Sequence, residues 1–233
     1  YVIDAVPERD DLGCQQLITS TAHFEEVRSL LDRTLSLMGL SASAKNCADL
    51  LNELKGLSGR LSMRLASVAA KSPGTGNVGS ELIALALVRG QCRKASDEDS
   101  CWLDLNRGFF VPLDDVRDLV PVPEWIDDEN EQEGASAGVT AARADLLYVE
   151  IPKTRGRISL RFVEVKYRRH LSQARSPDLA DRIADQVAVT RQRWLDCFFD
   201  EKVSTTERTL RAARLGRVLR FYAEKARRHN LRE

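Results

Sequence analysis

The sequence lacks several features that would identify common classes of protein. It has no apolar run near the roughly 18 residues that a membrane span requires, so we expect a soluble protein with no membrane partner. Its three histidines, His23, His170 and His229, lie far apart, which disfavours a zinc site or a Ser-His-Asp hydrolase. The five cysteines form no CxxC pair, and we expect them to be reduced, structural and cytoplasmic. No signal peptide follows Tyr1, and the missing methionine indicates a piece of a longer polypeptide.

The charges balance overall but are unevenly distributed. Lys plus Arg and Asp plus Glu both number 35, which by itself argues against a general nucleic-acid binder. Acidic residues concentrate at 127–133, whereas from 153 to 175 Glu164 is the single acid among basic residues. These basic residues are Lys153, Arg155, Arg157, Arg161, Lys166, Arg168, Arg169 and Arg175. The pattern predicts a local positive field, although solvated surface positions explain any one arginine equally well.

The first 72 residues are expected to form a helical region, and residues 73–233 an α/β core with C-terminal helices. Residues 1–18 show no clear period and predict an irregular lead-in. Apolar residues recur at helical spacing over residues 22–38, before Gly39, and again over 44–70. Gly56 and Gly59 could divide this second helix in two. We therefore expect an N-terminal helical hairpin.

Residues 72–79 are rich in glycine but lack the GxxxxGK[ST] pattern of a phosphate-binding loop. Ser80 is expected to cap a helix over 81–92, with Glu81 in its first turn. Beyond it, residues 102–111 predict a short amphipathic or extended stretch and 112–120 a turn followed by a short helix. Residues 121–138 have the composition of a surface loop.

The clearest β signal comes next. Residues 144–151 and 158–167 predict two strands, and the turn between them contains Gly156, so we expect an antiparallel hairpin. Helices are predicted over 178–199 and 207–228. Ser204 and Glu207 have the spacing of a capping box at the start of the second.

The second predicted strand carries the residues with chemical potential. Phe162, Glu164 and Lys166 share the parity of one sheet face, so an apolar face leads into an acid and a base. Asp145, at the start of the partner strand, can come near Glu164, and two carboxylates there would favour Mg²⁺ or Mn²⁺. Lys166 could then orient or help to deprotonate the water that attacks a phosphodiester.

An Asp, a gap and Glu-x-Lys on a β-hairpin resemble the PD-(D/E)xK nuclease superfamily over roughly residues 80–199. The resemblance implies a restriction-endonuclease-like fold, a mixed central sheet flanked by helices. It also implies that Glu81 contributes to the metal site with Asp145 and Glu164, and that Gln186 completes the catalytic group with Lys166. The sequence departs from the family pattern at Ala144, where proline is usual, and at Thr190, where a tyrosine often follows the glutamine.

The helical residues 21–70 and the region 103–119 are also similar to a domain within large bacterial HerA/FtsK-type ATPases of phosphorothioation-dependent restriction. That similarity implies antiphage defence, DNA as partner and an ATPase or helicase module in the same polypeptide or complex. Basic residues near the hairpin would contact phosphates without reading sequence. They are Lys153, Arg155, Arg157, Arg168 and Arg169.

The sequence thus predicts a metal-dependent DNA endonuclease or exonuclease domain of a bacterial defence protein. Three alternatives stay open. Glu164 and Lys166 could form an ordinary edge-strand salt bridge. The domain could be a catalytically inactive nuclease-like module that binds DNA or a partner protein. It could also be a helical scaffold in which the hairpin is incidental.

Overall fold

The structure, a computed structural model, contains helices and antiparallel strands, so the predicted α/β class is confirmed. It describes residues 2–5, 15–18, 31–32, 34–36, 38–41, 43–70, 76–97, 102–119, 143–151, 156–168, 177–200 and 202–230. The chain divides into two compact units. Unit 1 comprises Tyr1–Phe109, Val165–Arg169 and Glu224–Glu233, and unit 2 comprises Phe110–Glu164 and His170–Ala223. The division predicted after residue 72 stays a prediction.

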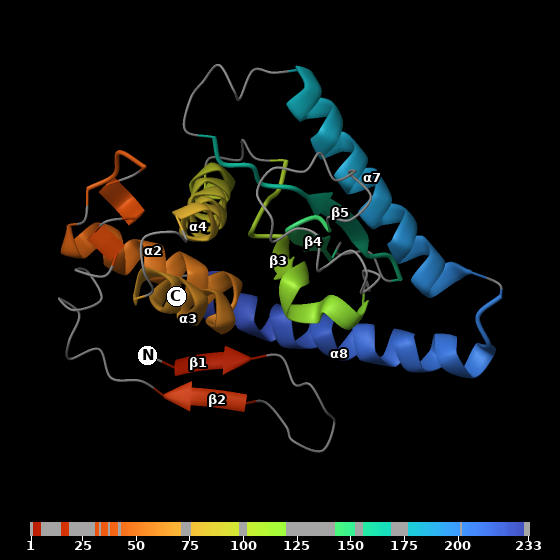
Figure 1. Ribbon diagram of the computed structural model, residues 1–233. Helices are drawn as coiled ribbons and strands as arrows, with labels where there is room; N and C mark the ends of the chain where they lie inside the picture. The colour runs from red at the N-terminus through yellow and green to blue at the C-terminus, as the bar shows by residue number, and fades with distance from the viewer. Residues whose placement is uncertain are drawn as a thin grey trace. The chain divides into compact units, whose positions relative to one another are not determined.

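Three helices form the centre of unit 1. They are α2 (Ala44–Leu57), α3 (Gly59–Ala70) and α4 (Gly76–Asp97), and each packs against the other two (Figure 1). The predicted division of the helical run over 44–70 is confirmed, because Ser58 adopts an extended backbone between α2 and α3. Buried leucines at helical spacing, such as Leu54, Leu57 and Leu61, supply the core.

The helical backbone around Leu35 ends at Gly39, as the sequence predicted. Gly39 has φ of 73°, which an L side chain rarely adopts. The Gly39 N–H donates to the Ser36 carbonyl at 3.0 Å and the Leu40 N–H to the Leu35 carbonyl at 2.9 Å. These two bonds form a Schellman motif, in which glycine is the favoured residue.

The prediction of an irregular lead-in over residues 1–18 is wrong. Strands β1 (Val2–Ala5) and β2 (Gln15–Ile18) pair antiparallel, with Val2 opposite Ile18. Strands of four residues are too short for alternation to be visible in the sequence. Each of these two strands forms by hydrogen bonding to the other, which a local sequence pattern does not reveal.

The predicted start of the helix at Ser80 is also wrong. Helix α4 begins at Gly76, so Ser80 lies inside it and Glu81 lies beyond its first turn. Ser80 is buried, as are the following residues 82–86, whereas Glu81 is exposed. Burial of this face against α2 and α3 outweighs the weak helix propensity of glycine and asparagine at the start of α4.

Unit 1 buries an ion-pair cluster between α2 and α4. One carboxylate oxygen of Glu53 bonds Arg89 and the other bonds Arg93. Burial lowers the pKa of the Arg89 guanidinium, and the carboxylate of Glu53 opposes that shift. Gly56 leaves room for the guanidinium, because a Cβ at this position would lie 2.5 Å from Arg89 Cζ.

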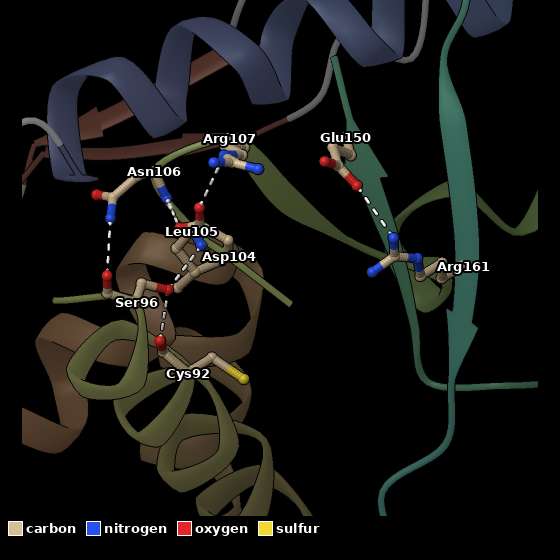
Figure 2. Close-up of polar contacts among 8 residues, drawn as sticks. All are labelled: Cys92, Ser96, Asp104, Leu105, Asn106, Arg107, Glu150 and Arg161. Atoms are coloured by element: carbon tan, nitrogen blue, oxygen red, sulfur yellow. Dashed lines mark hydrogen bonds and ion pairs between the residues drawn. The ribbon is translucent and has the colours of Figure 1, made fainter. Parts of the chain in front are cut away.

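The C-terminal part of α4 anchors the chain that follows it. The Ser96 hydroxyl donates to the Cys92 carbonyl at 2.7 Å and accepts the Leu105 N–H at 2.8 Å (Figure 2). Asn106 Nδ2 donates to the Ser96 carbonyl at 3.1 Å. These bonds fix the backbone that leads to β3.

A three-stranded sheet follows in the order β3 (Gly108–Pro112), β4 (Leu146–Glu150) and β5 (Ser159–Val163). A 3-10 helix, η1 (Leu113–Leu119), follows β3 where a short helix was predicted. Residues 146–149 of β4 are all buried, as expected for the central strand, whereas the residues of β5 are half-buried. The sheet therefore exposes β5 as one of its edges.

Strands β4 and β5 form the predicted antiparallel hairpin, with Leu146 opposite Val163 and Glu150 opposite Ser159. Gly156 in the connection has φ of 94°. The second strand is shorter than the predicted 158–167. The pairing of β5 with β4 ends at Val163, whose partner, Leu146, is the first residue of β4.

Two long helices complete the described chain. Helix α7 (Pro177–Phe199) runs beside β5 (Figure 1), and α8 (Thr205–Asn230) follows after a short turn. Ser204 caps α8 as predicted, because its hydroxyl accepts the Glu207 N–H at 3.2 Å. Glu207 itself forms an ion pair with Arg211 rather than returning to the cap.

Two expectations from composition concern cysteines and membrane spans. Cys47, Cys92 and Cys197 are buried, as expected of structural cysteines, and their reduced state stays a prediction; Cys14 and Cys101 lie outside the described residues. Among the helices that the structure describes, none combines the length and the apolar character needed to cross a membrane.

Candidate metal centre

The hairpin register brings the two acids predicted for the metal site toward each other. The ladder ends at the pair Leu146 and Val163, so Asp145 and Glu164 are the first residues beyond its paired end, one on each side of the hairpin. Directly opposed residues of an antiparallel pair have Cβ atoms about 4.5–5.5 Å apart. Two carboxylates at that spacing are within reach of a single divalent ion.

Helix α7 covers the sheet face to which Phe162 belongs. The rings of Phe162 on β5 and Trp194 on α7 meet edge to face, with centroids 5.7 Å apart. Side chains alternate between faces along a strand, so Glu164 has the parity of Phe162 and its partner Asp145 that of Leu147. The candidate centre therefore lies at the end of the hairpin, on the side of the sheet facing α7.

The opposite face of the hairpin is closed by other groups. The Arg161 guanidinium lies 5.7 Å from the centre of the Tyr148 ring and donates to Glu150 at 3.1 Å (Figure 2). Tyr148 also packs edge to face on Phe110, at 5.6 Å between centroids. These contacts assign Glu150 and Arg161 to the support of the sheet rather than to the candidate centre.

Glu164 is the more enclosed of the two acids. Its residue surface is half-buried, but both of its carboxylate oxygens are shielded from solvent. Burial disfavours a charged carboxylate unless its surroundings compensate. A centre that accepts a divalent cation would compensate both Glu164 and the acid opposite it.

Helix α7 holds the backbone that leads into Asp145. Gln186 Nε2 donates to the Arg143 carbonyl at 2.9 Å, and the Thr190 hydroxyl oxygen accepts the Ala144 N–H, also at 2.9 Å. Gln186 and Thr190 are both buried and lie one helical turn apart. Gln186, predicted as a catalytic residue, thus bonds the main chain two residues before Asp145.

Arginines next to this segment give it a positive environment. Arg143 pairs with Asp114 at 2.8 Å, and Asp114 also lies 3.7 Å from Arg117. Burial, and then the positive charge of Arg143, lower the pKa of the Arg193 guanidinium on α7. The charge of Arg143 therefore acts both on Asp114, through an ion pair, and on Arg193.

The remaining predicted catalytic residues, Glu81 and Lys166, belong to unit 1. Glu81 is exposed on α4, and Lys166 is exposed in the segment that follows β5. Only Asp145, Glu164 and Gln186 therefore share unit 2. Within the described part of the chain, no group of three His, Cys, Asp or Glu side chains lies close enough to hold a metal ion.

Two of the five predicted DNA-contacting residues have described side chains. Arg157 and Arg168 are both exposed, and Arg168 bonds the Tyr167 carbonyl at 2.9 Å. Lys153, Arg155 and Arg169 lie outside the described residues. On α8, Arg208 bonds the Val203 carbonyl and Arg211 the Cys197 carbonyl, so these two arginines stabilise the turn between α7 and α8.

Unit 1 contains a cleft of about 430 Å³ that the sequence did not indicate. Leu35, Leu50 and Ala86 contribute to its apolar lining, while Asp49, Glu53 and Arg93 contribute charge. Because Glu53 is already bonded by Arg89 and Arg93, its carboxylate is committed to the helix interface. The hairpin end in unit 2 is therefore the better candidate for chemistry.

Sequence reasoning missed Thr190 and Arg143 as parts of this site. A signal for Thr190 was present, because it follows Gln186 by four residues and so shares its face of a helix. No local pattern indicated that Arg143 pairs with Asp114, which lies 29 residues earlier.

Comparison of the chain with models of protein families, with curated proteins and with solved structures gives no match.

Proposed function

We propose that this chain is a metal-dependent DNA nuclease domain of the PD-(D/E)xK type, acting within a larger bacterial defence or restriction protein. One observation supports the proposal: Asp145 and Glu164 are the first residues beyond the paired end of the β4–β5 ladder, one on each side of the hairpin. Acids that converge at such a point would supply the oxygen ligands of the metal ion that this chemistry uses.

The pair of carboxylates fits Mg²⁺ or Mn²⁺. Magnesium is usually held by one or two carboxylates, together with waters and substrate phosphates, rather than by a complete protein cage. Asp145 and Glu164 would therefore suffice as protein ligands. Bound there, the ion would polarise a phosphoryl oxygen and stabilise the charge that develops during hydrolysis.

The chain's own basic residues would bind and orient the substrate. Arg157 and Arg168 are exposed and can contact backbone phosphates, which makes binding sensitive to salt and insensitive to sequence. Lys166 would orient the attacking water or accept its proton. Gln186 holds the carbonyl of Arg143, just upstream of Asp145.

The order of elements supports the same fold family. Among the described elements, α4 precedes β3, η1, β4 and β5 in the chain, and α7 comes after them. Asp145 comes just before β4, Glu164 just after β5, and Gln186 lies on α7. The proposed fold family also has a mixed central sheet, and we propose such a sheet for this chain.

The test is an incubation of the chain with linear, circular and single-stranded DNA in Mg²⁺ or Mn²⁺, with EDTA as the metal-free arm. The wild-type chain should cut at least one substrate in Mg²⁺ or Mn²⁺ and should cut none when EDTA removes the metal. Glu164→Gln should not cut, because it keeps the shape of the side chain and removes its charge. Glu224→Gln, at an exposed position on α8, is the matched control and should cut normally.

A second candidate function is a nuclease-like module that binds DNA or a partner protein without cutting. One observation favours it, since Glu81 is exposed on α4 in unit 1 while Asp145 and Glu164 belong to unit 2. Metal-independent DNA binding by wild type and Glu164→Gln alike, with no cleavage of any substrate, would establish this function in place of the nuclease.

A further inference from the structure

The Thr190 side chain links α7 to the backbone just before Asp145. Its hydroxyl donates to the Gln186 carbonyl at 2.8 Å and accepts the Ala144 N–H at 2.9 Å. A hydroxyl can donate one hydrogen bond while accepting another, so both bonds form together. Thr190 is 0% exposed, which keeps water from replacing the side chain in either bond.

Two further bonds hold the same short segment. Gln186 Nε2 donates to the Arg143 carbonyl, and the Leu113 N–H donates to the Asp145 carbonyl at 2.9 Å. The Arg143 carbonyl and the Ala144 N–H belong to one peptide group, so Gln186 and Thr190 hold the same peptide from α7. The Asp145 carbonyl is held on the other side by the residue after β3.

This segment lies where the hairpin ladder has ended. Leu146 is the last β4 residue that pairs with β5, so the ladder itself does not fix Asp145 opposite Glu164. Side-chain bonds from α7 supply that constraint instead. A change in the Ala144 peptide would rotate the Asp145 carboxylate relative to Glu164.

We propose that Thr190 is a positioning residue whose hydroxyl bridge from α7 to Ala144 fixes Asp145 against Glu164 and so sets the affinity of the hairpin end for a divalent cation. The inference rests on the proposed function, because it concerns the same pair of carboxylates. Thr190 touches neither the ion nor the substrate; it acts through the backbone of Ala144.

The experiment titrates the full chain with Mn²⁺ alone and follows the free ion by electron paramagnetic resonance. Thr190→Val keeps the shape of the side chain and removes both bonds, whereas Thr190→Ser keeps the hydroxyl. Residues that orient metal ligands typically change metal affinity about 10–100-fold when they are substituted. We expect a loss of at least about tenfold for Thr190→Val on that basis, and an affinity near wild type for Thr190→Ser.

A matched control separates positioning from a general loss of stability. Tyr222→Phe removes a partly buried hydrogen bond of unit 2, from the hydroxyl of the buried Tyr222 to Asp115 at 3.0 Å, and leaves the bonds to the Ala144 segment in place. It should lower the unfolding midpoint and leave Mn²⁺ affinity unchanged. Equal losses of affinity in Tyr222→Phe and Thr190→Val would overturn the positioning role.

Glu164→Gln distinguishes this inference from the proposed function. If Glu164→Gln abolishes Mn²⁺ binding and Thr190→Val binds like wild type, the metal centre stands and the positioning role is wrong. If wild type binds no Mn²⁺, the proposed metal centre is wrong and the positioning role is wrong with it. If Thr190→Val does not fold, Thr190→Ala takes its place, since its smaller side chain also lacks the hydroxyl, and the same outcomes apply.

Discussion

Each of the two units encloses a carboxylate, but the charges around the two differ. In unit 1, Glu53 is bonded through one oxygen to Arg89 and through the other to Arg93. In unit 2, both oxygens of Glu164 are shielded from solvent, and a second acid, Asp145, lies just beyond the same paired end of the hairpin. A carboxylate between guanidiniums is neutralised by the protein, whereas facing carboxylates favour a cation. Burial of an acid therefore does not identify a metal centre; the charge opposite it does.

The largest effect should come from the centre in unit 2. Lys166→Ala should lower the rate of DNA cleavage by about 10²–10⁴-fold, the range for a residue that assists proton transfer. DNA binding and the circular dichroism spectrum should not change. Lys202→Ala, at an exposed lysine before α8, is the matched control and should cut at the wild-type rate. Wild-type cleavage by purified Lys166→Ala would remove Lys166 from the reaction.

The next effect should come from the ion-pair cluster in unit 1. Glu53→Ala leaves the buried Arg89 guanidinium without its carboxylate and should lower the free energy of unfolding by about 3–5 kcal/mol. Urea denaturation measures the change. The double variant Glu53→Met with Arg89→Met should regain most of the loss, because apolar side chains often replace a buried ion pair at little cost. A double variant no more stable than Glu53→Ala would contradict this account.

Two glycine substitutions should have opposite signs. In Gly56→Ala, the new Cβ would lie 2.5 Å from Arg89 Cζ, so the ion pair to Glu53 must shift, and we expect a loss of about 1–3 kcal/mol. In Gly216→Ala on α8, the Cβ meets nothing within 4 Å, and a gain of about 0.5–1 kcal/mol is expected from helix propensity. Thermal unfolding of both variants measures the difference. A stabilising Gly56→Ala would show that Arg89 is free to move.

The smallest effect should be local to the start of α8. Ser204→Ala removes the hydroxyl that accepts the Glu207 N–H and should cost about 1 kcal/mol in unfolding free energy. Thr206→Ala, two residues later at an exposed position, is the control and should change stability little. Mn²⁺ affinity should be unaffected by either substitution, since the cap is remote in sequence from Asp145 and Glu164.

Much of the hairpin could be predicted from the sequence because its signals are local. An apolar run indicated the buried residues 146–149, and a turn glycine indicated the positive φ at Gly156. The cap of α8 at Ser204 was equally local, because Glu207 follows it by three residues. The start of α4 could not be predicted, because packing of its buried face, rather than propensity, extends it back to Gly76. The paired strands β1 and β2 were missed for a similar reason. Gln15 lies ten positions after Ala5 in the sequence, and only the strand pairing brings the two together.

The support of the candidate centre could not be predicted at all. Thr190 and Ala144 are 46 residues apart, and Gln186 and Arg143 are 43 apart. Hydrogen bonds across such separations depend on where α7 packs on the sheet. The sequence suggested a catalytic role for Gln186, but its bond to the Arg143 backbone emerged only from the fold.

By itself, the sequence determined the α/β class, the two strands of the β4–β5 hairpin and the helices around them, because hydrophobic period, turn residues and caps act over short distances. Tertiary structure alone decided that Glu53 is enclosed with Arg89 and Arg93. It also decided that α7 fixes the backbone before Asp145 through Thr190 and Gln186. The physical reason is that strand register and helix packing, which join residues distant in the chain, set the distances on which electrostatic compensation depends.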